Sequence, residues 1–111
     1  MKKILSITCL ILLSFTTISN ASIVGNWRTE SGETANISSC DDSYCIKLTT
    51  GTYQGKQIGK VKESKDKYIG TVTDPEEDKT YSGSATVTGS SLKLKGCALK
   101  IFCKTQTWTK M

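Results

Sequence analysis

Apolar and polar residues alternate along short runs of this chain, and that alternation constrains the fold more than any other feature. From Ser91 to Lys95, Leu92 and Leu94 alternate with lysines, and Lys79–Thr88 intersperses small and apolar residues with serines and threonines. A period of two is the spacing of one face of a β-strand, whereas a helix repeats its face about every 3.6 residues. Helical spacing is absent beyond a few residues. We therefore expect an all-β protein.

Turn-forming residues separate these runs, so the sequence predicts about eight strands joined by short hairpins. The predicted strands are Ile23–Thr29, Thr34–Cys40, Cys45–Thr50, Gln57–Glu63, Tyr68–Thr73, Lys79–Thr88, Ser91–Ala98 and Phe102–Lys110. Parallel strands would need crossovers of a dozen or more residues, and these connections are too short. A small antiparallel up-and-down β-barrel satisfies the pattern, because closure removes the exposed edges of the sheet.

The first residues have the pattern of a cleavable export signal. Two lysines precede an apolar run, Ile4–Phe15, and a polar stretch ends at Ala21. We expect cleavage after Ala21, which removes residues 1–21 with Cys9 and leaves a single domain over residues 22–111. The apolar run is shorter than the roughly 20 residues that cross a bilayer, so we expect no transmembrane segment after processing. A periplasmic or secreted location follows.

Four cysteines remain after that cleavage, in two close pairs: Cys40 with Cys45, and Cys97 with Cys103. An even number in a small exported domain predicts two disulfides. A zinc site is the alternative, but neither pair has the two-residue spacing of zinc ligands. The pairs flank the second and seventh turns of the meander, at opposite ends of the barrel, and bridged Cα atoms must lie within about 7 Å. We therefore predict a disulfide within each pair, the first across the turn Asp41–Tyr44.

The charge of the chain is positive and unevenly distributed. The net charge of +5 falls by two with the N-terminal lysines, to about +3, and no acidic residue follows Asp78. The lysines of this C-terminal part alternate with apolar residues, as the solvated face of a strand does. We therefore expect no binding of nucleic acid.

Residues for common catalytic chemistry are scarce. The chain contains no histidine, which removes the usual base for serine or cysteine nucleophiles and the commonest metal ligand. The carboxylates of Asp74–Asp78 lack the spacing of a calcium loop and are typical of a solvated turn. We expect no enzymatic activity, no cofactor and no metal site.

Several segments resemble the uncharacterised bacterial exported proteins of domain-of-unknown-function family 2147 (DUF2147). They are GTVTDPEEDKTYSGSATVTGSSLKLKGCALKIFCKTQTWTK, GNWRTE near residue 25, and CDDSYC around the first cysteine pair. The resemblance extends over residues 22–111. It implies a small barrel of the lipocalin-like, or calycin, kind.

The calycin resemblance also implies a role for the triplet Gly25-Asn26-Trp27. In calycins, the indole of a Gly-x-Trp triplet on the first strand packs beneath a basic side chain from the last strand and closes the barrel floor. Lys110 is the candidate cation and Lys104 the second choice. A desolvated cation over an indole contributes about 1 to 2 kcal/mol. A tryptophan that packs in the core without this role is the alternative.

Two functions remain open at this point. In the first, a non-catalytic barrel of the bacterial envelope holds a small apolar or amphipathic ligand, with Trp27, Tyr81, Phe102 and Trp108 lining its interior. In the second, side chains fill the barrel and the protein binds an envelope protein, as an inhibitor-like factor would. Eight strands enclose little more than their own core, which favours the second. The analogy with calycins favours the first, and we expect ligand binding by a narrow margin.

Cleavage after Ala21 predicts that the protein recovered from its own host begins at Ser22. N-terminal sequencing checks this directly. A protein that begins at Met1 or retains Cys9 would contradict the export signal.

Overall fold

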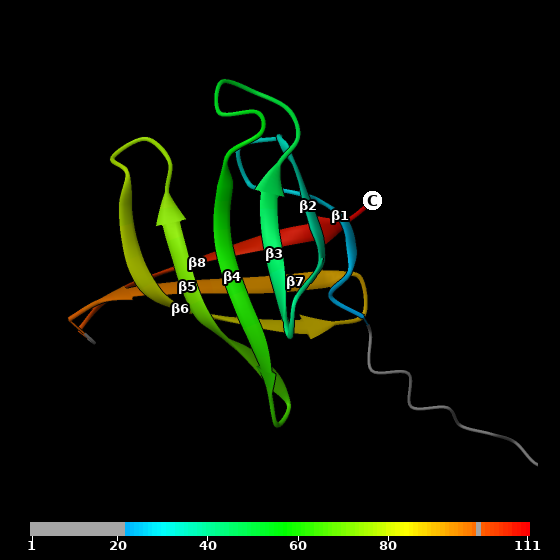
Figure 1. Ribbon diagram of the computed structural model, residues 1–111, viewed down its shortest axis with the longest axis vertical. Helices are drawn as coiled ribbons and strands as arrows, with labels where there is room; N and C mark the ends of the chain where they lie inside the picture. Colours follow the sequence, from blue (N-terminus) through cyan, green and yellow to red (C-terminus); the bar gives the residue numbers. More distant parts are fainter. Residues whose placement is uncertain (1–21, 100) are drawn as a thin grey trace, which may run out of the picture.

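A computed structural model describes residues 22–99 and 101–111, which form eight β-strands; the predicted signal and Cys9 lie outside the described residues. The strands are β1 (Gly25–Arg28), β2 (Thr34–Cys40), β3 (Ser43–Leu48), β4 (Gln57–Ser64), β5 (Lys67–Asp74), β6 (Lys79–Thr88), β7 (Ser91–Ala98) and β8 (Phe102–Lys110). Each strand pairs antiparallel with the next, and β8 pairs with β1 to close a barrel (Figure 1). The described residues include no helix long and apolar enough to span a membrane.

The predicted all-β up-and-down barrel is therefore confirmed, and its strand bounds differ from the prediction by a few residues. One difference of two residues is at the turn between β2 and β3, where the predicted turn Asp41–Tyr44 shortens to two residues. Cys40 pairs with Ser43, so β3 begins before Cys45. Asp41 has a φ of 57°, a left-handed conformation that aspartate tolerates and tight hairpins require.

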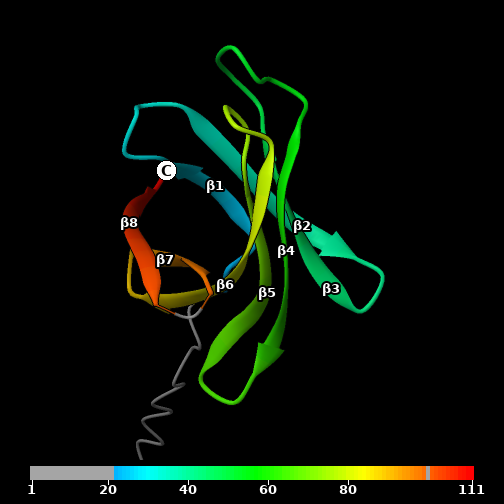
Figure 2. The same ribbon diagram turned by 90° about the vertical axis from the view of Figure 1, so that its left-hand side faces the viewer.

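The sheet coils strongly as it closes. In Figure 1, β3 and β4 run across the direction of β7 and β8, while β5 and β6 bend between the two directions. Figure 2 shows β1, β6, β7 and β8 forming a ring, with the hairpins of the other strands extending beyond it. Short connections and strong coiling together produce a barrel from a chain with few residues per strand.

A row of glycines crosses the sheet where β5 and β6 bend. Gly70 lies opposite Val61 on one side and Gly83 on the other, and Gly83 lies opposite Gly96. A Cβ on Gly70 would collide with the carbonyl oxygen of Lys60 and lie 2.8 Å from the Cα of Val61. Strands approach here more closely than a side chain allows, which is a common reason for glycine inside a strand.

The interior of the barrel is packed with aliphatic and aromatic side chains. Trp27 and Trp108 are the largest buried residues, with 0% and 2% of their surface exposed. The other members of the core are Ile23, Ala35, Ile37, Ile46, Leu48, Ile58, Val61, Ala85, Leu92 and Leu94. Tyr44 and Tyr68 pack against this core. Their two rings contact each other edge to face, with centroids 5.5 Å apart. Burial, the proximity of Glu63 and then that of Tyr44 raise the pKa of Tyr68.

Both predicted disulfides are present among the described residues. Cys97 lies directly opposite Cys103 in the β7–β8 ladder, and their Cα atoms are 4.0 Å apart. Cys45 lies opposite Ser38 rather than Cys40, so the other disulfide runs diagonally, with a Cα separation of 5.8 Å. The sulfurs of these four cysteines are therefore in disulfides. By strand alternation, both crosslinks lie on the outside of the barrel.

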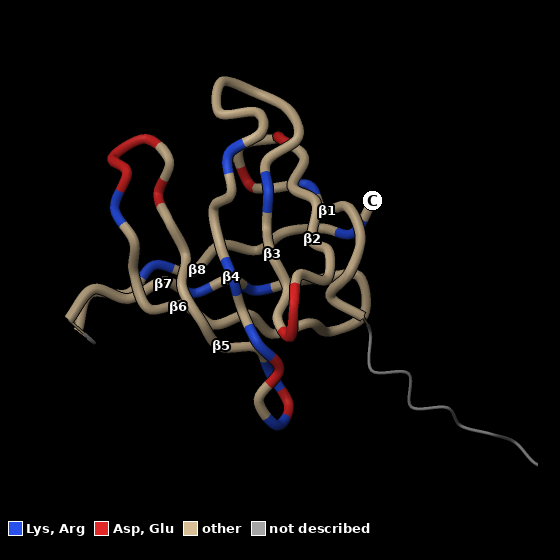
Figure 3. Tube along the Cα trace, viewed as in Figure 1, with Lys and Arg blue, Asp and Glu red and all other residues tan. Residues whose placement is uncertain are grey.

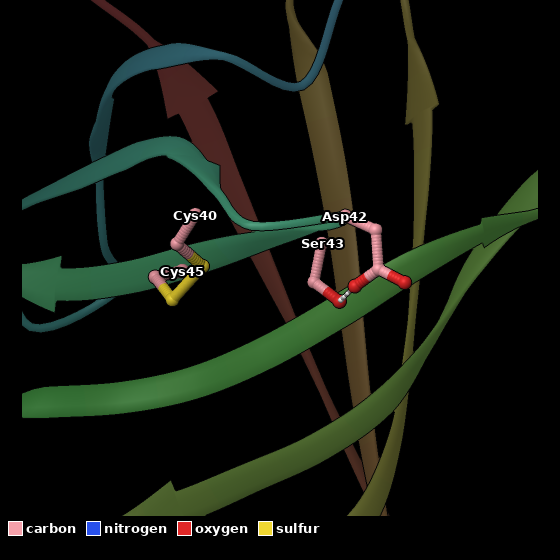
Figure 4. The surroundings of a disulfide bond; sticks show 4 residues. All are labelled: Cys40, Asp42, Ser43 and Cys45. Atoms are coloured by element: carbon pink, nitrogen blue, oxygen red, sulfur yellow. Dashed lines mark hydrogen bonds between the residues drawn. A yellow bond between two sulfur atoms is a disulfide. The ribbon is translucent and has the colours of Figure 1, made fainter.

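The first disulfide lies next to a turn that is also held by polar contacts (Figure 4). The hydroxyl of Ser43 donates a hydrogen bond to Oδ1 of Asp42 at 3.3 Å. Nζ of Lys62, on β4, contacts Oδ2 of the same carboxylate at 3.1 Å. This lysine is the main reason why the pKa of Asp42 is lowered. The turn is thus tied to the neighbouring strand as well as across its own hairpin.

The glycine row generates a stability prediction. We expect Gly70→Ala to destabilise the protein by about 1 to 3 kcal/mol, because the new methyl group meets backbone atoms that cannot move independently. Gly96→Ala is the matched control, since a Cβ there meets nothing closer than Cβ of Tyr81 at 3.9 Å. Urea denaturation measures both. Equal losses of stability in the two variants would show that close approach is not why glycine occupies position 70.

Candidate functional site

The most unusual surface of the barrel is the end of the β7–β8 hairpin. Three large apolar side chains are exposed here: Leu99 by 83%, Ile101 by 76% and Phe102 by 70%. We call these three residues the apolar tip. Figure 1 shows this hairpin projecting at the left, away from the rest of the barrel. Contiguous exposed apolar side chains on a soluble domain typically mark a binding surface.

The base of the apolar tip is covalently closed. The Cys97–Cys103 disulfide joins the two strands next to the tip, and Ala98 pairs with Phe102 immediately beyond it. The N–H of Ile101 donates a hydrogen bond to the carbonyl of Ala98 at 3.2 Å, closing the turn. A crosslink at this position keeps the two strands together at the base of the tip, which reduces the entropy that binding would cost.

The exposure of Phe102 corrects the expectation that it lines the barrel interior with Trp27 and Trp108. Phe102 does lie in the inward-facing row of β8, but of that row Trp108 is buried and Phe102 is not. The reason is the short seam between β8 and β1, which joins Trp27 to Lys110 and Arg28 to Thr109. The first part of β8 extends past β1 and lacks a hydrogen-bonded neighbour on that side, and its inward row stays exposed from Phe102 to Gln106.

A shallow depression of about 410 Å³ lies beside the tip, between the start of β6 and the end of β7. Half-buried Tyr81 contributes its aromatic ring, and Ala98 and Leu99 contribute apolar atoms. Lys79 lies at its edge, with Nζ 3.8 Å from Oε1 of Glu77. The depression therefore combines an apolar wall with a charged rim.

Trp27 and Lys110 meet at the opposite end of the barrel, as the calycin resemblance implies. Nζ of Lys110 lies 5.0 Å from the centroid of the Trp27 ring, and it donates hydrogen bonds to the carbonyls of Val24 at 3.1 Å and Ser22 at 3.4 Å. A Cβ on Gly25 would lie 3.2 Å from that nitrogen, so glycine leaves room for the cation. Lys110 thus connects the backbone of residues 22–24 to the buried indole of Trp27.

The aromatic residues predicted to line one cavity are instead distributed over three places. Trp27 and Trp108 belong to the core, Tyr81 borders the depression, and Phe102 belongs to the apolar tip. The indole N–H of Trp27 donates to the carbonyl of Ile23 at 2.9 Å, and that of Trp108 donates to Oε1 of Gln106 at 2.9 Å. Both indoles therefore have internal hydrogen-bond partners and act as packing residues.

Sequence reasoning missed Leu99 and Ile101 as members of a site. The signal was the segment Ala98–Phe102, in which four of five residues are apolar and break the alternation of the flanking strands. An apolar turn is unusual, because turns ordinarily contain polar residues and glycine.

The carboxylates of the β5–β6 turn have a structural role. Oδ1 of Asp74 accepts hydrogen bonds from the N–H groups of Glu76 at 2.9 Å and Glu77 at 3.4 Å. An aspartate that binds backbone amides two and three residues ahead stabilises a turn, as the sequence suggested for this segment.

Comparison with known protein families gives a match. The family model described as "Uncharacterized protein conserved in bacteria (DUF2147)" matches residues 47–110, more than half of the chain. The match runs from the end of β3 to the end of β8 and includes the apolar tip and its disulfide, whereas Trp27 and the first disulfide precede it. No curated protein and no solved structure matches the chain.

The contact at the barrel floor generates the next prediction. We expect Lys110→Met, which keeps most of the aliphatic stem and removes the charge, to destabilise the protein by about 1 kcal/mol. Lys104→Met is the control: it removes the same charge from an exposed position near the other end of β8, and a change within about 0.5 kcal/mol is expected. Thermal or chemical denaturation compares the two. Equal effects would mean that contact with Trp27 contributes nothing specific.

Proposed function

This chain belongs to the DUF2147 family of bacterial proteins, and we propose that it is an exported, non-catalytic binding protein of the bacterial envelope whose apolar tip inserts into a partner protein. The barrel acts as the scaffold for that tip. This is the inhibitor-like alternative of the two functions that the sequence left open.

The observation that carries the proposal is an exposed apolar hairpin, crosslinked at its base, on a packed barrel. Leu99, Ile101 and Phe102 expose most of their surface to water, an arrangement that a partner's cleft would relieve by burying them. Large apolar side chains at the centre of an interface commonly supply most of its binding energy. The disulfide at the base of the tip lowers the entropic cost of ordering these anchors.

Disulfides and composition support the remaining parts of the proposal. Disulfides persist in oxidising compartments such as the periplasm, which supports export. The lack of histidine supports a binding role over acid–base or nucleophilic catalysis.

The depression beside the tip favours a second candidate function, the binding of a small apolar or amphipathic ligand. Its volume of about 410 Å³ is within the size of ligand pockets, and Tyr81 with Leu99 would provide an apolar wall. The buried tryptophans argue against a ligand inside the barrel, since their rings occupy that space. A ligand would therefore bind at the rim, and native mass spectrometry of protein purified from its own host detects one that co-purifies.

Substitutions in the tip test the proposed function. We expect Ile101→Ser with Phe102→Ser to weaken partner binding by about 30-fold or more, the effect of losing an interface anchor. Ile69→Ser is the matched control, because Ile69 is also an exposed apolar residue, at 45%, but lies on β5. Crosslinking in envelope extract identifies the partner, and surface plasmon resonance with that purified partner gives the affinities.

Two results would contradict the proposal. One is a partner that binds the tip variant as tightly as the unmodified protein. The other is a co-purified small ligand whose binding is lost in a Tyr81 variant while no protein is captured, which selects the second candidate. Circular dichroism verifies that each variant is folded.

A further inference from the structure

A second surface lies on the outside of β6, β7 and β8, where every outward side chain of two adjoining rows is a hydroxyl or a lysine. One row places Ser84, Lys95 and Thr105 side by side across the three strands, and the next places Thr86, Lys93 and Thr107. We call these six residues the hydroxyl–lysine face. Their inward neighbours Ala85, Leu92 and Leu94 are buried, which fixes this face toward solvent.

The hydroxyl–lysine face is hollowed. Five of its six residues, with Thr88 and Ser91 beyond them, line a groove of about 630 Å³. Among residues 22–99 and 101–111, Lys93 and Lys95 form no ion pair, whereas Lys56, Lys62 and Lys79 each contact a carboxylate. Both lysines line the groove, so their ammonium groups are available to an external anion.

Most of the negative charge lies elsewhere on the molecule. No acidic residue follows Asp78 in the sequence, so β6, β7 and β8 contain none. Figure 3 shows the acidic residues concentrated at hairpin ends while basic residues follow β7. Glu30 borders the face, where its Oε2 accepts a hydrogen bond from the N–H of Thr107 at 2.7 Å. That carboxylate is therefore bound to the backbone of β8, which of the three strands lies furthest from β6.

We propose that the hydroxyl–lysine face binds an anionic polysaccharide. Lysine ammonium groups supply charge, and flanking hydroxyls can both donate to and accept from sugar hydroxyls. The residues that line the groove recur at every second position along β6 and β7, so its hydroxyl and ammonium groups repeat along the strands. Such a repeat suits a linear polymer. A lipid bilayer fits less well, because none of the groove-lining residues is an apolar side chain that could enter it. This site is separate from the apolar tip and does not rest on its function.

Polygalacturonate, a linear carboxylated polysaccharide, is a suitable probe for the oxidised full protein, with neutral dextran and anionic phospholipid vesicles beside it. We expect binding of polygalacturonate that weakens with salt, and none of dextran. Lys93→Gln with Lys95→Gln should weaken it by about 25-fold, since a lysine near an anionic surface contributes roughly a fivefold factor. Lys47→Gln with Lys67→Gln is the matched control, because it removes the same charge from exposed positions on β3 and β5.

The outcomes separate a specific face from general attraction. Retained binding in the Lys47/Lys67 variant with loss in the Lys93/Lys95 variant supports the proposal. Equal weakening in both variants would reduce the effect to net charge and overturn it, and so would binding to vesicles without binding to polygalacturonate. The Ile101→Ser and Phe102→Ser variant should bind polygalacturonate normally, which keeps this test independent of the proposed function.

Discussion

The short seam between β1 and β8 determines how the two ends of this barrel differ. It joins Trp27 to Lys110 and Arg28 to Thr109, and Lys110 adds its contact with the Trp27 ring. Where the seam exists, the sheet closes around a packed core. Where β8 continues past β1, it has β7 as a neighbour but no strand on its other edge, and Phe102 is exposed. A single constraint on strand pairing thus produces both the closed floor and the free hairpin.

Other features allow so small a barrel to persist with this geometry. A domain of this length buries only about 60 to 65% of the surface of its unfolded chain, so its core is thin. Glycines at positions 70 and 83 let bent strands approach closely, and each disulfide adds typically 2 to 4 kcal/mol by restricting the unfolded chain. Because the interior is used for stability, binding is best placed on outer surfaces. The apolar tip and the hydroxyl–lysine face are two such surfaces with different chemistry.

The strands, the barrel and the disulfides could be predicted from the sequence because they follow from local rules. Alternation located the strands, and turn residues separated them. The cysteine pairing followed because the second and seventh turns of a meander lie at opposite ends of the barrel. The position of Phe102 could not be predicted, because alternation gives the face of a residue but not whether another strand covers it. That coverage depends on the register of β8 against β1, a pairing between opposite ends of the chain. Leu99 and Ile101 were missed because an apolar turn departs from the usual turn composition.

The closed part of the barrel is packed by its own buried side chains. Solvent exchange of the two indole N–H groups, followed by NMR, tests this packing most directly. The N–H of Trp27 is buried against the carbonyl of Ile23, whereas that of Trp108 bonds Gln106 nearer the uncovered part of β8. Slow exchange is expected for Trp27 and faster exchange for Trp108. Rapid exchange of both would reveal a hydrated interior and contradict the packed barrel.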